Sequence, residues 1–179
     1  MIIKLDFEKA FDRIEHQAML ILMQAKGFGQ KWLKRMKDIM ESRTSTVLLN
    51  GVIGKTFHCR WGVTQGDPLS PLLFVLAADF LQSMINKAKD LGLIQLPIPT
   101  VYTNDFLVVQ YADDTLIIME GDARQLFFLK ALLNNFSLAI GLRINFNKSM
   151  MVPINVADEK LYLLARTFGC SKGLCPSPI

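Results

Sequence analysis

The chain has 179 residues, of which 51% are hydrophobic and 20% are charged, and its formal net charge is +4. This length fits a single domain, and the apolar content excludes an intrinsically disordered chain. No apolar run approaches the roughly 18 residues of a membrane span, and no signal peptide is evident, so an intracellular protein, cytoplasmic or nuclear, is expected.

Hydrophobic periodicity and helix breakers predict strands and helices that alternate along the whole chain. In chain order the expected elements are a strand at 2–7 followed by a turn, helices at 16–25 and 30–42, a hairpin with arms at 44–49 and 55–60, a loop at 62–71, a helix at 72–89, a hairpin with arms at 106–111 and 115–119, a helix at 123–140, paired strands at 143–145 and 149–152, and a helix at 158–168. This order is typical of an α+β domain.

The predicted helix at 30–42 is amphipathic and carries a cluster of positive charges. Lys31, Lys34, Arg35 and Lys37 lie opposite its apolar residues. Such a face is either a solvated surface or a nucleic-acid contact, and the sequence leaves both readings open.

Acidic residues occupy two unusual places. Asp6 ends the first apolar strand, and Asp113-Asp114 lies at the tip of a hairpin between two apolar strands, with no basic residue within five positions of the pair. Adjacent carboxylates repel each other unless a cation is near, and carboxylate oxygens are the preferred ligands of Mg²⁺. An Asp-Asp pair can also simply form a tight turn.

Four segments, in order, resemble the motifs of reverse transcriptases. They are residues 4–12 (KLDFEKAFD), 62–71 (GVTQGDPLSP), 110–114 (QYADD) and 141–149 (GLRINFNKS). The first and fourth resemble the non-LTR (LINE-type) retrotransposon enzymes, those of plants in particular.

The resemblance implies a polymerase palm, a ferredoxin-like antiparallel sheet with packed helices. It implies RNA-directed DNA polymerase activity, a nucleotidyltransferase reaction that adds dNTPs to a primer 3′-hydroxyl on an RNA template. Asp6, Asp113 and Asp114 become the catalytic and metal-binding residues for two Mg²⁺ ions, with Mn²⁺ as an alternative. Asp114 has the lesser role.

The resemblance also implies substrate-binding roles for five residues. Phe7 and Phe11 lie in the first motif, where Phe11 matches the aromatic that excludes a ribose 2′-hydroxyl. The alternative for Phe11 is a core residue. Gln65 and Gly66 match positions that line the nucleotide and template. Lys148 matches a basic residue near the triphosphate, or is an exposed lysine on a turn.

The same resemblance predicts how much of the enzyme is present. Residues 1–169 are expected to form a partial, truncated palm, with fingers mostly absent and thumb absent. Residues 170–179 form an aberrant tail, which a single-base deletion would explain because a shifted reading of the family's usual continuation yields Leu-Cys-Pro-Ser-Pro-Ile. Alternatives are an inactive retrotransposon relic or a nucleic-acid-binding fragment, and the oligomeric state is left open.

Overall fold

The structure, a computed structural model, describes residues 1–63, 66–95, 97, 108–111 and 114–173, without the side chains of Ala10, Phe11 and Tyr111. Its helices are α1 (Ala10–Arg13), α2 (His16–Ala25), α3 (Gln30–Glu41), α4 (Leu69–Asp90), α5 (Ala123–Ile140) and α6 (Asp158–Phe168). Its strands are β1 (Ile2–Leu5), β2 (Phe7–Glu8), β3 (Thr44–Ser45), β4 (Leu48–Leu49), β5 (Val52–Ile53), β6 (Phe57–His58), β7 (Val108–Tyr111), β8 (Asp114–Ile118), β9 (Arg143–Ile144), β10 (Met150–Val152) and β11 (Ser171–Lys172).

The main sheet has five strands in the order β11-β10-β1-β8-β7. All neighbouring strands are antiparallel except β10 and β11, which are parallel. Strand β1 lies in the middle of the sheet, where its residues pair on both sides with β8 and β10. The predicted α+β class and mostly antiparallel sheet are confirmed.

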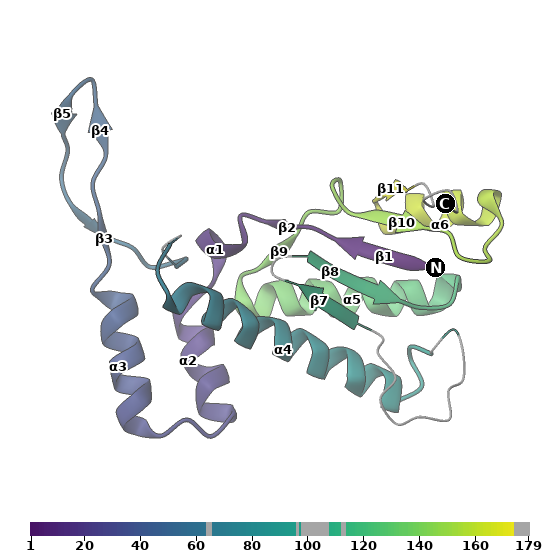
Figure 1. The fold of residues 1–179 in the computed structure, drawn as a ribbon, viewed down its shortest axis with the longest axis horizontal. Coiled ribbons are helices and arrows are strands. Elements are labelled where there is room, and N and C mark those ends of the chain that lie inside the picture. Colours follow the sequence, from purple (N-terminus) through teal and green to yellow (C-terminus); the bar gives the residue numbers. More distant parts are fainter. Residues whose placement is uncertain (64–65, 96, 98–107, 112–113, 174–179) are drawn as a thin grey trace.

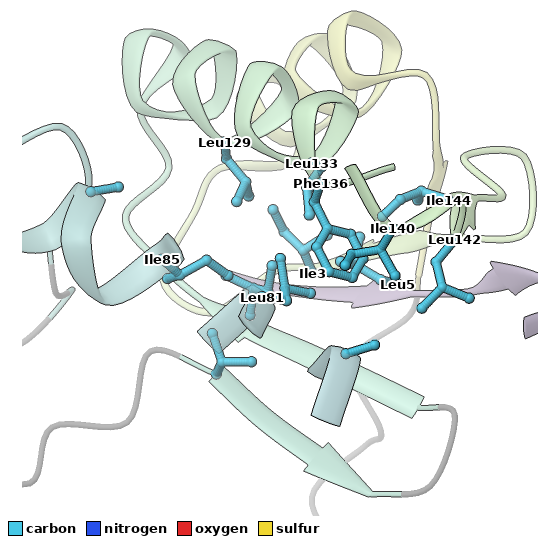
Figure 2. Close-up of a cluster of buried hydrophobic side chains, with 14 of the residues drawn as sticks. Ile3, Leu5, Leu81, Ile85, Leu129, Leu133, Phe136, Ile140, Leu142 and Ile144 are labelled. Carbon is cyan, nitrogen blue, oxygen red and sulfur yellow. The ribbon is translucent and has the colours of Figure 1, made fainter. Parts of the chain in front are cut away.

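One face of this sheet is covered by α4 and α5 (Figure 1). Ile3 and Leu5 of β1 are fully buried there, whereas Ile2 and Lys4, which alternate with them, are only half-buried. Figure 2 shows the two strand residues surrounded by apolar side chains of both helices, Leu81, Ile85, Leu129, Leu133, Phe136 and Ile140. Burial of each such side chain stabilises the fold by about 1.5–3 kcal/mol, so this layer is the main source of stability.

A second region projects away from the sheet and is called the arm here, residues 26–60. It contains α3 and a long hairpin in which β3 pairs with β6 and β4 with β5 (Figure 1). The hairpin turns at Asn50 and Gly51, whose φ angles are 48° and 79°. Two consecutive positive φ angles are what a type I′ turn requires, and Asn-Gly is its preferred sequence, so the predicted hairpin is confirmed.

Helix α4 has 22 residues and is long and apolar enough to cross a membrane by length and composition alone, the one such helix in the described ranges. This corrects the expectation that no apolar stretch reaches that length. The helix packs against α5 and β7 and buries Leu73, Ala77 and Leu81. A core helix of a globular domain has the same properties, so its composition is weak evidence for a membrane span.

Two expectations about local structure are wrong. Residues 10–13 form the short helix α1 where only a turn is expected. The segments 143–145 and 149–152 contain strands, but these do not pair with each other. Instead β9 pairs with β2, and β10 pairs with β1 and β11. Strands β9 and β10 are both antiparallel to consecutive parts of residues 2–8, so they run in the same direction and do not form a hairpin with each other.

Candidate active site

The register of β1 and β8 brings two predicted site residues to one end of the sheet. Leu5 lies opposite Thr115 in this antiparallel pair. Asp6 follows Leu5 and Asp114 precedes Thr115, so the same register continued by one residue places Asp6 opposite Asp114. Two carboxylates 108 positions apart along the chain are thus adjacent in the fold.

Lys4 lies on the same side of the sheet as Asp114. Its Nζ is 2.9 Å from Oδ1 of Asp114, and both side chains are partly exposed, by 41% and 56%. Side chains alternate between the two faces of a strand, so this face is opposite the one on which Ile3 and Leu5 enter the core. The local sequence around Asp114 contains no such cation, and the structure supplies one from the neighbouring strand.

Three predicted site residues lie outside what the structure describes. Strands β7 and β8 pair as far as Tyr111 opposite Asp114, and Asp113 belongs to the connection between them. Gln65 is likewise outside the described residues. Phe11 is part of α1, but nothing is described of its side chain. Their roles stay predictions.

The fourth motif holds the backbone of Asp6 in place. The Asp6 amide donates to Oγ of Ser149 (3.1 Å), and the Asp6 carbonyl accepts from the Asn145 amide (2.8 Å). Ser149 is fully buried, and its hydroxyl donates in turn to the Asn145 carbonyl (2.8 Å). Because a buried amide without a partner costs about 1–3 kcal/mol, Ser149 and Asn145 fix the backbone that carries the Asp6 carboxylate.

Neither Ser149 nor Asn145 is among the site residues predicted from the sequence. Both lie in a motif that resembles the family, but nothing in their spacing identifies Asp6 as the partner. Ser149 and Asp6 are 143 positions apart.

The structure also describes Phe7, Gly66 and Lys148. Phe7 packs edge-to-face against Phe74 and Phe136, with ring centroids 6.0 and 6.4 Å apart, so the structure shows a packing role for it. Gly66 is exposed with a φ of 89°, and no atom lies within 4 Å of where a Cβ would be. Lys148 is exposed on the turn after Asn145.

Gly62 joins the loop of the second motif to the first. A Cβ on Gly62, whose φ is 77°, would lie 2.6 Å from the Asp12 carbonyl oxygen. The Gly62 amide donates to the Ile14 carbonyl (2.8 Å), and its own carbonyl is 2.7 Å from Nε2 of His16. Only glycine permits this approach, so the first two motifs are tied together by backbone contacts.

The donor chemistry of this end of the sheet suits a hard divalent cation. Asp6 and Asp114 supply carboxylate oxygens, which Mg²⁺ prefers. Among the described residues no three His, Cys, Asp or Glu side chains gather closely enough to hold a metal ion.

Comparison with known proteins agrees with the four motifs. The sequence profile of the family "Reverse transcriptase (RNA-dependent DNA polymerase)" matches residues 1–163. The chain is 29% identical over 167 residues to a Pol polyprotein of the R2 retrotransposable element from Popillia japonica, covering 93% of this chain and 22% of that protein. It is 30% identical over 149 residues to the transposon TX1 149 kDa protein from Xenopus laevis, covering 82% of this chain and 11% of that protein.

Solved structures show the same fold at low sequence identity. Apo telomerase from Candida tropicalis superposes with a TM-score of 0.63 and 18% identity, over 88% of this chain and 31% of that one. Telomerase from Candida albicans in complex with a fragment of telomeric RNA gives a TM-score of 0.62 and 14% identity, over 89% and 28%. The predicted palm fold is thereby confirmed.

The chain spans about a fifth or less of the length of these curated relatives. The likeness to plant elements in particular stays a prediction, as does the division at residue 169. Members of the family are metal-dependent nucleotidyltransferases. The chain belongs to the reverse transcriptase family of RNA-dependent DNA polymerases, in the branch of the non-LTR retrotransposons.

Proposed function

We propose that this chain is the palm part of an RNA-directed DNA polymerase that adds deoxynucleotides to a DNA primer on an RNA template, with Mg²⁺ as the metal. The observation that carries the proposal is the meeting of Asp6 and Asp114 at one end of β1 and β8, on the face of the sheet that the helices leave uncovered. Matches to proteins named for retrotransposable elements support it.

In this proposal Asp6 and Asp113 would hold two Mg²⁺ ions, which would lower the pKa of the primer 3′-hydroxyl and neutralise the charge of the departing pyrophosphate. Ser149 and Asn145 fix the Asp6 backbone, so that its carboxylate needs no reorganisation during the reaction. Asp114, already paired with Lys4, orients the hairpin that carries Asp113.

The substrate roles complete the proposal. Phe11 excludes a ribose 2′-hydroxyl, Gln65 and Gly66 line the nucleotide and template, and Lys148 contacts the triphosphate. Gly66 suits its role because the space where a side chain would start is empty of protein atoms, which leaves room for a strand to approach the backbone. Lys148 is exposed and so is free to reach a phosphate.

The test is extension of a labelled DNA primer on an RNA template by the purified chain in Mg²⁺. Asp6→Asn and Asp113→Asn should each lower the rate by at least about 10²-fold, because each removes charge from the site of metal binding. Asp90→Asn is the matched control, since Asp90 is an exposed carboxylate at the far end of α4, and it should keep the wild-type rate.

Two outcomes would contradict the proposal for this chain. One is a folded wild-type protein that extends no primer, which favours the inactive-relic alternative. The other is extension that Asp6→Asn leaves unchanged, which would mean that the carboxylates do not serve the reaction.

A further inference from the structure

The positive charge of this protein is concentrated in the arm. Residues 26–60 contain eight lysines and arginines and two acidic residues, a net charge of +6, whereas the whole chain carries +4. The rest of the chain, including the candidate active site, therefore carries −2. A division of charge of this kind marks a region that attracts polyanions.

Helix α3 carries several of these cations on the side that faces away from the main sheet. It packs on α2 through Met36 and Met40, which are buried, and α2 separates it from the sheet (Figure 1). Lys31, Lys34 and Arg35 are all exposed, and spacings of three and four residues place them side by side on one helical face.

An exposed aromatic side chain lies beside these cations. Trp32 is 55% exposed and Ile39 is 45% exposed. Trp32 precedes Arg35 by three residues and Ile39 follows it by four, so both apolar side chains lie next to the cations on the helix surface. Trp32 therefore offers the flat face of an indole to the solvent directly beside the cations.

We propose that this face of α3 binds single-stranded nucleic acid, with Lys31, Lys34 and Arg35 on successive phosphates and an unpaired base stacked on Trp32. Cationic grooves with aromatic platforms bind single strands in this way, without reading their sequence. Stacking on an indole needs a base free of its own duplex, which favours a single strand over a double helix. Only the identity of the bound strand rests on the proposed function: it is the part of the RNA template that is not paired with the DNA primer.

The first experiment measures the salt dependence of binding of a short, fluorescent oligouridine to the whole chain by anisotropy. The arm variant is Lys31→Ala/Lys34→Ala/Arg35→Ala. The control is Arg124→Ala/Lys160→Ala/Arg166→Ala, which removes three exposed cations from α5 and α6. Both variants have the same net charge, and circular dichroism checks that both fold.

Each phosphate contact of a single strand contributes about 0.7 to the slope of log affinity against log salt, so three contacts contribute about 2. The arm variant should lose this part of the slope. The ratio of the wild-type affinity to the variant affinity should therefore fall about 20-fold between roughly 50 and 200 mM salt. The control should keep the wild-type slope. Equal losses in the two triple variants would show a general charge effect and overturn the proposal.

The second experiment tests the stacking. Trp32→Ala should weaken oligouridine binding about fivefold or more, and Trp32→Phe should retain most of the affinity. Tyr162→Ala, which removes an aromatic ring that is 60% exposed on α6, should have no effect. Equal affinity for a duplex and for oligouridine would overturn the single-strand assignment, and so would an unchanged affinity in Trp32→Ala.

These readouts are independent of catalysis. Asp6→Asn should bind oligouridine as the wild type does even though its primer extension is lost. If the arm variants bind oligouridine as the wild type does, the arm proposal fails and the primer-extension result is unaffected. If the wild type extends no primer, the proposed function fails and the oligouridine-binding result is unaffected. If α3 instead docks a protein, oligouridine binding will be insensitive to all the arm variants.

Discussion

The sheet and the arm use similar residues with opposite results. Leu5 in β1 is fully buried, whereas Leu48 in β4 is 67% exposed and its partner Ile53 is 76% exposed. Strand β1 has a strand on either side and helices over one face, while β4 and β5 have only each other. The comparison teaches that apolar composition makes a strand buried only when a second layer covers it.

The two regions therefore depend on different forces. The sheet is held by burial of apolar surface between layers, and the arm hairpin by its turn and its short strand pairs. An isolated two-stranded hairpin is marginally stable in water. We expect the hairpin to open locally at a much lower free energy than the sheet, and the following predictions test this difference.

The largest effect is expected in the core. Phe136→Ala should lower the free energy of unfolding by about 3–5 kcal/mol, because the ring is fully buried between α5 and the sheet. Leu48→Ala should change it by less than about 0.5 kcal/mol. Urea denaturation measures both, and similar losses would show that the hairpin is packed against something in solution.

The next largest effect on the free energy of unfolding is expected for Gly62, which contacts the first motif, compared with Gly51 in the arm hairpin. Gly62→Ala forces a Cβ to within 2.6 Å of the Asp12 carbonyl oxygen, so we expect a loss of about 2–4 kcal/mol from the clash and the left-handed backbone. Gly51→Ala meets no atom within 4 Å and should cost only the backbone strain, about 1–2 kcal/mol. Hydrogen exchange should confine the Gly51 effect to the hairpin, and a global effect would break the comparison.

Loss of a hydroxyl should be costly at the site and nearly neutral in the arm. Ser149→Ala leaves the Asp6 amide without its partner and should cost about 1–3 kcal/mol. Thr46→Ala removes an exposed hydroxyl contact with Thr56 and should cost less than about 0.5 kcal/mol. Primer extension by the Ser149 variant should fall by more than its folded fraction, and a rate that tracks folding alone would deny Ser149 a positioning role.

The smallest effect concerns Cys170, which packs against the core beside α6. Burial raises the pKa of its thiol to about 11, against an ordinary 9.0. The folded state therefore holds this proton more tightly than the unfolded state, and stability should decline as the pH rises from about 9.0 through about 11.

The reactivity of the same thiol supplies the measurement. Mass spectrometry resolved by peptide should show slow alkylation of Cys170 near pH 8 in the folded protein and fast alkylation in urea. Equal rates in the two states would mean that the site is open to water.

Local signals predict much of the secondary structure. Helices α2, α5 and α6 have the bounds that their periodicity predicts. Their ends depend on nearby groups: the Asp122 side chain accepts from the Gln125 amide at the start of α5, and Gly141 ends it with a φ of 86°. Interactions over three or four residues can be predicted from a sequence because both partners are close together along the chain.

The pairing of strands is harder to predict from the sequence. Segments 143–145 and 149–152 read as partners because they are short, apolar and close together. Strand β9 instead pairs with β2 and β10 with β1, more than a hundred positions away, and β10 also pairs with β11. Alternation within a strand specifies which face is buried but does not identify the neighbouring strand.

The sequence is sufficient to predict the α+β class, the order of helices α2 to α6, the Asn50-Gly51 turn and the motifs that identify the family. Only the tertiary structure decided that Lys4 pairs with Asp114, that Ser149 supports Asp6, and that Trp32 is left exposed beside the arm cations. The physical reason is the range of the interactions. Turns, caps and amphipathic faces depend on neighbours within a few residues, whereas ion pairs, buried hydrogen bonds and exposure depend on which distant segments the fold brings together.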